Sequence, residues 1–171
     1  MKKNIAAEGL QAAVINMAVS DHDGETQMKK VLGLPPKPLD SEDDWVRGTS
    51  HVCEKEHGVP DSEDLSFEEF TVKCVTLTTL IERMLPFSLP GSRWARRGLI
   101  DFDSIDYMQI DAEGHELYIL ENYDFRICPT MIKIEHAHME ANFREPEDIV
   151  KILKHHKYMT FMEEKDVYGI I

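Results

Sequence analysis

Two repeating patterns of apolar residues divide the chain into predicted strands and helices. Short runs rich in β-branched and aromatic residues, bounded by Gly, Pro or clustered Asp, are typical of buried strands. After the first of these runs, Asp21 to Gly24 supplies the Asp and Gly that favour a tight turn into a returning strand. Strands are predicted at Ala12 to Ser20, Glu25 to Val31, Phe70 to Leu77, Ile105 to Ile110 and Met131 to His138.

Apolar residues at helical spacing predict the remaining elements. The clearest case is Glu147 to His156, whose apolar residues form one face that would cover a sheet. A helix that starts at Thr78 is expected to stop before Pro86. Helices are predicted at Lys2 to Gly9 (its last turns), Ser41 to Val46, Thr78 to Met84, Gly114 to Tyr123 and Glu147 to His156, and a terminal hairpin at Tyr158 to Glu163 and Val167 to Ile171.

The order of these elements indicates a single α/β domain. Because strands alternate with helices, we expect a mostly parallel sheet with helices on both faces, followed by a C-terminal antiparallel hairpin. The length of 171 residues fits one domain, residues 1–171. The segment at about residues 32–69 breaks the alternation, since it is rich in Asp, Glu and Pro. It is interpreted as an irregular acidic insertion, of the kind that forms lids or disordered segments.

Composition narrows the function classes. The net charge of -13 repels polyphosphate, so nucleic-acid binding is not expected. No apolar run approaches the roughly 20 residues that span a bilayer, and the N-terminus lacks the apolar core of a signal peptide. The three cysteines, Cys53, Cys74 and Cys128, form no CxxC pair, which fits a reducing compartment. The sequence therefore predicts a cytoplasmic protein without membrane contact.

The stretch from Ile105 to Leu120 is the strongest candidate for chemistry. A predicted buried strand ends in Asp111 and Glu113, and apolar residues then recur at helical spacing. Ligands bind at the carboxyl ends of parallel strands, so these two carboxylates would lie at the mouth of a site. Structural roles are the alternative: Asp111 would accept N–H bonds in the turn, and Glu113 would favour the positive end of the next helix.

The same stretch carries a family resemblance. The motif Ile-Asp-x-Glu-Gly-x-Glu, followed by Leu-x-x-Leu and a second strand that reaches Glu135, resembles the FkbM-type methyltransferases. The resemblance also includes Asn16 to Gly24 and Ile132 to Ile171. It implies a Rossmann-like class I methyltransferase fold with S-adenosylmethionine as the cofactor. The implied reaction is O-methylation of a hydroxyl on a small molecule or sugar.

The resemblance also implies roles for individual residues. Asp111 would position cofactor and acceptor, Glu135 or His136 would accept the hydroxyl proton, and Glu113 would orient the turn or bind substrate hydroxyls. A histidine titrates near neutrality and is a natural general base, but at a strand end it is also a common surface residue. The adenine ring of the cofactor is expected at the end of the first strand, where the alternative role is core packing. The residues there are Met17, Ala18 and Val19.

One part of the family pattern has no counterpart here. The glycine-rich first strand and turn, which holds the methionine end of the cofactor, is not found before Ala12. The resemblance thus implies an N-terminally truncated domain that binds S-adenosylmethionine weakly and that would need a partner chain or a missing N-terminal segment. A truncated, non-catalytic interaction domain is the alternative.

A metal-dependent hydrolase is a third reading of the same residues. Asp111 and Glu113, like His136 and His138, are two positions apart, which places each pair on one side of an extended chain. Carboxylates together with imidazoles suit zinc, iron or manganese. Because no compact signature such as HExxH is present, we expect no metal in the site.

Overall fold

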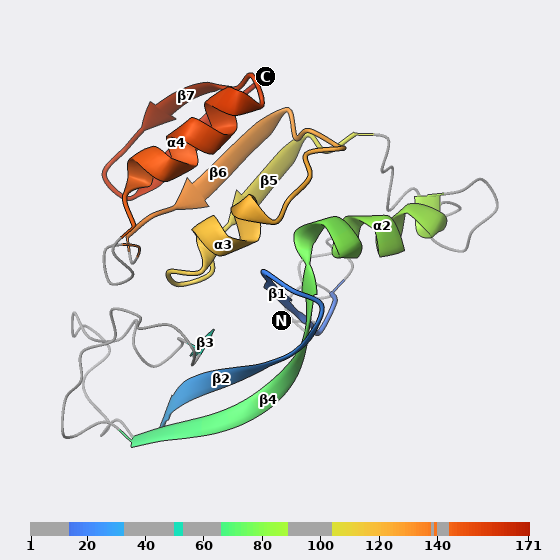
Figure 1. The fold of residues 1–171 in the computed structure, drawn as a ribbon, viewed down its shortest axis with the longest axis vertical. Helices are drawn as coiled ribbons and strands as arrows, with labels where there is room; N and C mark the ends of the chain where they lie inside the picture. Colours follow the sequence, from blue (N-terminus) through green and yellow to red (C-terminus); the bar gives the residue numbers. More distant parts are fainter. Residues whose placement is uncertain (1–13, 33–49, 53–65, 89–103, 138, 140–143) are drawn as a thin grey trace, which may run out of the picture.

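The chain folds into two four-stranded sheets with three helices among the residues described (Figure 1). The structure, a computed structural model, describes residues 14–32, 50–52, 66–88, 104–137, 139 and 144–171. Its elements are β1 (Ala18–Ser20), β2 (Gly24–Leu32), β3 (Ser50–Val52), β4 (Ser66–Thr76), α2 (Leu77–Ser88), β5 (Tyr107–Ile110), α3 (Glu116–Glu121), β6 (Met131–Glu135), α4 (Pro146–His155), β7 (Met159–Met162) and β8 (Asp166–Ile170).

Both sheets are mixed, so the prediction of a mostly parallel sheet is wrong. The first sheet has the order β1-β4-β2-β3, and only β1 and β4 run parallel. The second has the order β5-β6-β8-β7, and only β5 and β6 run parallel. Parallel neighbours need a crossover connection, which α3 supplies between β5 and β6. The predicted C-terminal hairpin is confirmed as β7 and β8.

Several predicted elements have different bounds in the structure, and the first strand and the helix α2 differ in ways that have a physical reason. The first predicted strand is wrong over residues 14–17, which form no strand, and Ile15 and Met17 there are exposed. Helix α2 continues through Pro86 to Ser88 and does not stop before the proline. Pro86 lies in the last turn, where its missing N–H removes only a bond near the helix end.

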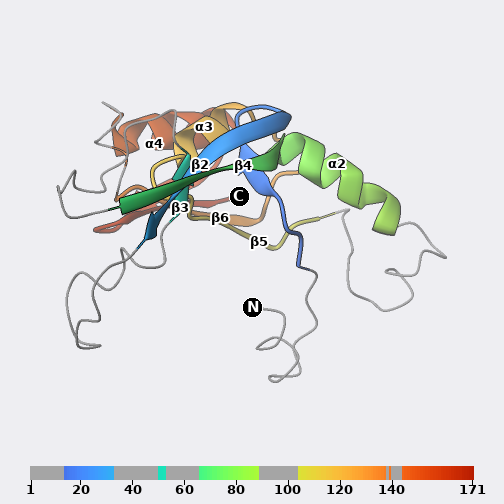
Figure 2. The same cartoon turned by 90° about the horizontal axis from the view of Figure 1, so that it is seen from below.

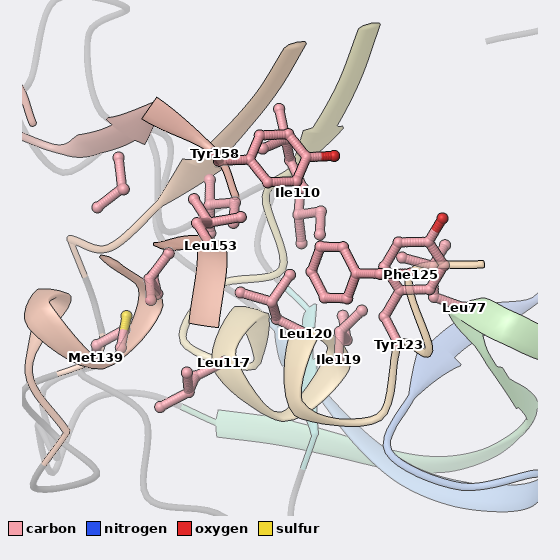
Figure 3. Packing of buried hydrophobic residues seen from close by; sticks show 14 of the residues in the cluster. Leu77, Ile110, Leu117, Ile119, Leu120, Tyr123, Phe125, Met139, Leu153 and Tyr158 are labelled. Carbon is pink, nitrogen blue, oxygen red and sulfur yellow. The ribbon is translucent and has the colours of Figure 1, made fainter. Parts of the chain in front are cut away.

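The core lies between the second sheet and the helices α3 and α4. These two helices lie side by side on one face of the sheet, where we expected helices on both faces (Figures 1 and 2). In β6, burial alternates with the strand period, so that Ile132 and Ile134 face the helices and are fully buried. The side chains that fill this layer include Ile110, Leu117, Ile119, Leu120, Leu153 and Tyr158 (Figure 3).

The segment predicted as an irregular insertion contains regular structure where it is described. Strand β3 lies inside it, and β4 begins at Ser66, four positions before the predicted start at Phe70. The helices predicted at Lys2 to Gly9 and Ser41 to Val46 lie outside the described residues, as do Cys53 and His138. Among the helices that the structure describes, none is long and apolar enough to cross a membrane.

Candidate active site

The register of β5 and β6 brings Asp111 and Glu135 together. The two strands are parallel with Ile110 opposite Ile134, so the next residues, Asp111 and Glu135, meet at the carboxyl edge of the sheet. The sequence predicted that the polar residues at the end of β6 lie beside Asp111, and this is confirmed for Glu135. This edge is where parallel α/β sheets bind ligands.

Glu116, the first residue of α3, completes a cluster of three carboxylates. One oxygen from each of Asp111, Glu116 and Glu135 lies within 4.8 Å of the other two. Glu116 Oε1 accepts hydrogen bonds from the backbone N–H groups of Ala112 (2.6 Å) and Gly114 (3.2 Å). Its Oε2 is buried and has no hydrogen-bond partner among the described residues. Glu116 therefore fixes the turn through Oε1 and also belongs to the cluster.

Two of the three carboxylates have raised pKa values. Burial, a hydrogen bond with Asp111 and the charges of Asp111, Glu113 and Glu116 raise the pKa of Glu135 to about 7. Burial also raises the pKa of Glu116, whereas the hydrogen bonds that its carboxylate accepts from backbone N–H groups lower it. Carboxylates this close share a proton, because two like charges repel at short range. The same spacing would also let a divalent cation with oxygen ligands bridge the three groups.

The turn between β5 and α3 has an unusual backbone. Glu113 adopts a φ of 51° and Gly114 a φ of 94°. For Glu113 this left-handed conformation is costly, whereas glycine adopts it freely. Such strain is common at functional sites, where the surrounding structure holds it in place. The hydrogen bonds from Ala112 and Gly114 to Glu116 help to hold this turn, as does the bond from the N–H of His115 to the carbonyl oxygen of Ala112 (3.2 Å).

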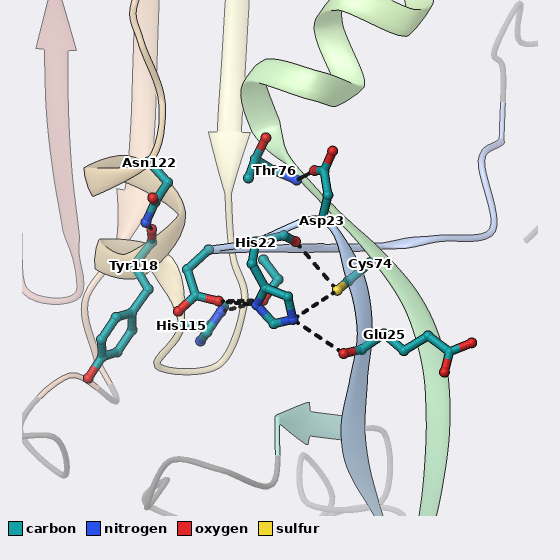
Figure 4. Close-up of polar contacts among 10 residues, drawn as sticks. His22, Asp23, Glu25, Cys74, Thr76, His115, Tyr118 and Asn122 are labelled. Carbon is teal, nitrogen blue, oxygen red and sulfur yellow. Dashed lines mark hydrogen bonds and ion pairs between the residues drawn. The ribbon is translucent and has the colours of Figure 1, made fainter.

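A buried polar contact ties this turn to the first sheet. Ser20 Oγ, at the end of β1, and His115 Nε2 lie 3.1 Å apart, and both side chains are buried. Figure 4 shows His115 beside the turn after β1, close to a contact of 3.6 Å between His22 Nε2 and Cys74 Sγ. Burial and neighbouring carboxylates raise the pKa of the Cys74 thiol, so it is not an activated nucleophile.

A cavity of about 280 Å³ lies between β1 and β5, next to the cluster. Of the three residues expected near the adenine ring, Val19 lines this cavity, whereas Met17 is exposed and Ala18 is not part of the lining. Asp111 borders the cavity at its polar end. The remaining lining residues are Leu77, Met108, Gln109, Ile110, Ala112 and Ile119.

His136 faces a different part of the molecule. Its ring Nε2 lies 3.4 Å from the carbonyl oxygen of Glu163, and its backbone N–H donates to Lys165, so it contacts the β7–β8 turn. The carboxylate cluster contains neither His136 nor Glu113 among its members. The metal ligands that the hydrolase hypothesis requires are thus not brought together among the described residues. The fourth of these ligands, His138, lies outside them.

Two residues of the site were not predicted to be functional from the sequence. Glu116 and His115 are polar residues in a stretch whose neighbours, Leu117 and Leu120, are core residues. The sequence did contain a signal: Glu116 is spaced so that it falls on the same helix face as the apolar residues. Burying a carboxylate is costly unless it is paired or used, so its position there indicates a function. Glu116 is also the last residue of the Ile-Asp-x-Glu-Gly-x-Glu motif.

Comparison with known proteins identifies one family. Residues 3–160 match the Methyltransferase FkbM domain, which is most of the chain and includes the turn and the carboxylate cluster. Neither a curated protein nor a solved structure matches the chain significantly. The chain therefore belongs to the FkbM methyltransferase family.

Proposed function

We propose that this chain is an S-adenosylmethionine-dependent O-methyltransferase domain that methylates a hydroxyl of a small molecule or sugar. Family membership supports methyl transfer, and the position of Glu135 beside Asp111 at the sheet edge, where its pKa is raised to about 7, is the observation that supports a base for the acceptor's proton. A general base works best when its pKa lies near the working pH. Glu135 meets this requirement, and it stands at the sheet edge beside a cavity.

The roles of the residues follow from their positions. Asp111, exposed at the polar end of the cavity, would align the acceptor hydroxyl and place negative charge near the sulfonium. Glu135 would take the hydroxyl proton. Glu116 would act as a positioning residue, because its bonds to Ala112 and Gly114 fix the turn that carries Asp111. The cofactor supplies a methyl group that is already activated, so alignment and proton removal are the protein's part.

The cavity fits only part of the cofactor. Its volume of about 280 Å³ is just below the roughly 300–1,000 Å³ of typical ligand sites. Its apolar lining suits an adenine ring, and the carboxylates at its edge suit a positive sulfonium. We infer that the chain binds the cofactor weakly unless a partner chain adds contacts to the site.

The setting that we propose is the cytoplasm, without nucleic acid or membrane as partner. The net charge of -13 argues against nucleic acid as a partner, because it repels the phosphate backbone. Cys74 and Cys128 are free thiols, as expected in a reducing compartment.

Calorimetry with S-adenosylhomocysteine, followed by transfer of labelled methyl from S-adenosylmethionine to a panel of polyols and sugars, tests the proposal. We expect weak, saturable binding that Asp111→Asn reduces, and transfer that rises with pH around 7. Glu121→Gln is the matched control, since it removes an exposed carboxylate at the end of α3, outside the cluster of three carboxylates. Absence of binding at millimolar concentration would favour the non-catalytic interaction domain.

A further inference from the structure

The cavity beside the carboxylate cluster has walls from two different sheets. Val19 of β1 lines one wall, and Asp111 and Ala112, which follow β5, line the other. Strands β1 and β5 belong to separate sheets, and no backbone pairing among the described strands joins them. Contacts other than strand pairing must therefore hold the two walls at their distance.

Ser20 and His115 make a contact of this kind directly next to both walls. Ser20 follows Val19 in the chain, and His115 lies three positions after Ala112. The two residues are 1% and 2% exposed, and Ser20 Oγ lies 3.1 Å from His115 Nε2. Water does not compete for a buried hydrogen bond, so this contact is stronger than an exposed one of the same geometry.

The direction of this hydrogen bond follows from the neighbours of Ser20. Its hydroxyl donates to Asp21 Oδ1 at 3.1 Å, because an ionised carboxylate can only accept. A serine hydroxyl has one hydrogen, so Ser20 Oγ must accept from the ring of His115. The contact therefore requires a hydrogen on His115 Nε2. The Asp21 oxygen is itself held by His22 Nδ1, which lies 2.8 Å away.

His115 is fastened to the second sheet. Its backbone N–H donates to the carbonyl oxygen of Ala112, and its own carbonyl oxygen accepts from the N–H of Ile119, both at 3.2 Å. Its ring stacks on Tyr118, with 5.2 Å between the ring centres. The ring is thus held in place by the turn and by α3, and its Nε2 offers β1 a fixed point of attachment.

Strand β1 is the wall that depends on this attachment. It has three residues and lies at the end of its sheet, where it pairs with β4 alone among the described strands. The turn after β5, by contrast, keeps its bonds from Ala112 and Gly114 to Glu116 without Ser20. Loss of the contact should therefore displace Val19 and leave Asp111 in place.

We propose that Ser20 and His115 are positioning residues that hold β1 at the distance from β5 that the adenine ring of the cofactor requires. Neither residue lines the cavity, so both act through Val19. This inference rests on the proposed function, which assigns the adenine ring to the cavity. It adds a division of roles: Ser20 and His115 set the affinity for the cofactor, whereas Asp111 and Glu135 act on the acceptor.

Calorimetry with S-adenosylhomocysteine, together with the kinetics of methyl transfer, tests the proposal. Ser20→Ala and His115→Leu should each raise the dissociation constant, and the KM for S-adenosylmethionine, about tenfold, as expected for the loss of one buried hydrogen bond. The kcat should stay within about twofold of the parent value. The double variant should bind no more weakly than either single variant, because both changes remove the same contact.

Two further variants serve as controls. His115→Gln keeps an N–H donor as many bonds from the backbone as Nε2 and should restore most of the affinity. Thr71→Ala removes a hydroxyl from an exposed hydrogen bond on β4, in the same sheet as β1, and should bind like the parent chain. Circular dichroism checks that every variant is folded at the temperature of the binding measurement.

Nitrogen NMR of the histidine rings tests the contact without any cofactor. The His115 signals, which are those absent from His115→Gln, should be those of a ring with a hydrogen on Nε2. They should change in Ser20→Ala and stay the same in Thr71→Ala. A His115 ring that carries its hydrogen on Nδ1 alone would overturn the proposal.

The binding results separate this proposal from the proposed function. If the parent chain binds S-adenosylhomocysteine and Ser20→Ala binds it equally well, the positioning role alone is wrong, even where the variant melts at a lower temperature. A fall in kcat with unchanged affinity has the same meaning. A parent chain that does not bind S-adenosylhomocysteine would overturn both the proposed function and the positioning role.

Discussion

The two sheets of this chain are stabilised in different ways. In the first, β2 and β4 form a long antiparallel ladder whose visible side-chain contacts are polar and exposed, such as Gln27 Nε2 to Thr71 Oγ1 at 2.8 Å. In the second, four short strands lie under α3 and α4, and Ile132, Ile134 and Val167 are fully buried. Among the described residues, apolar burial in the first sheet is limited to Cys74 and Val75 at the end of β4, whereas in the second sheet it extends over β5, β6 and β8.

The difference between the two sheets also affects the candidate active site. The carboxylate cluster stands entirely on β5, β6 and α3, elements anchored by the core. The first sheet contributes Val19 to the cavity and Ser20 to the contact with His115. A precise arrangement of charged groups requires rigid support, which the packed core of the second sheet supplies. The following predictions test this contrast.

The largest expected effect is on folding of the second sheet. Ile132→Ala should lower the free energy of unfolding by about 2–5 kcal/mol, because it leaves a cavity in a fully buried layer. Gln27→Ala in the first sheet removes one exposed hydrogen bond and should cost about 1 kcal/mol or less. Urea denaturation measures both, and equal losses would contradict the contrast.

The next effect concerns turnover. Asp111→Asn removes a charge-assisted contact worth about 1.5–3 kcal/mol, so methyl transfer should fall by about one to two orders of magnitude. Because Asp111 is exposed, the melting temperature should change little. Both quantities are measured on one preparation. A destabilised but fully active variant would remove Asp111 from the site.

Gly169 tests how closely the second sheet is packed. A Cβ at this position would lie 3.0 Å from Ile132 Cγ2 and from Tyr158 Cδ1, and 3.2 Å from Leu153 Cδ1. Gly169→Ala should therefore destabilise the fold by about 1–3 kcal/mol. Gly24→Ala is a poor control, since its φ of 143° adds strain, so Thr160→Ala on the facing strand is preferable.

The titration of Glu135 links the site to stability. Its pKa rises on folding from 4.5 to about 7, so between these values the folded chain holds a proton that the unfolded chain has lost. The free energy of unfolding should therefore fall as pH increases from 4.5 to 7. Glu135→Gln should reduce this slope, leaving the part due to Glu116, and be more stable than the parent at pH 7.5. Urea titrations at pH 5 and 7.5 check both expectations.

The smallest expected effect is that of divalent cations. We expect EDTA to leave methyl transfer and the titration midpoint of Glu135 unchanged, because the proton already relieves the repulsion in the cluster. A midpoint that Mg²⁺ shifts to lower pH would show that the three carboxylates bind a cation.

The sequence by itself determined the strand, turn and helix around Asp111. The change from strand to helical period at this point predicted β5 and α3, and the same reasoning predicted β6, α4 and the terminal hairpin. These elements have a strong pattern because one face of each is buried in a single core. Family membership was also readable from the motif at Asp111.

Tertiary structure alone decided how the strands pair and which carboxylates meet. Pairing direction depends on connections and neighbours, which local patterns do not encode, so the mixed sheets were mispredicted. In the sequence Glu116 resembles an ordinary helix residue. Only the fold shows that it is buried and lies beside Asp111 and Glu135 in the site. The pKa of Glu135 likewise arises from desolvation and from neighbours brought together by the fold, since an isolated glutamate has no such surroundings.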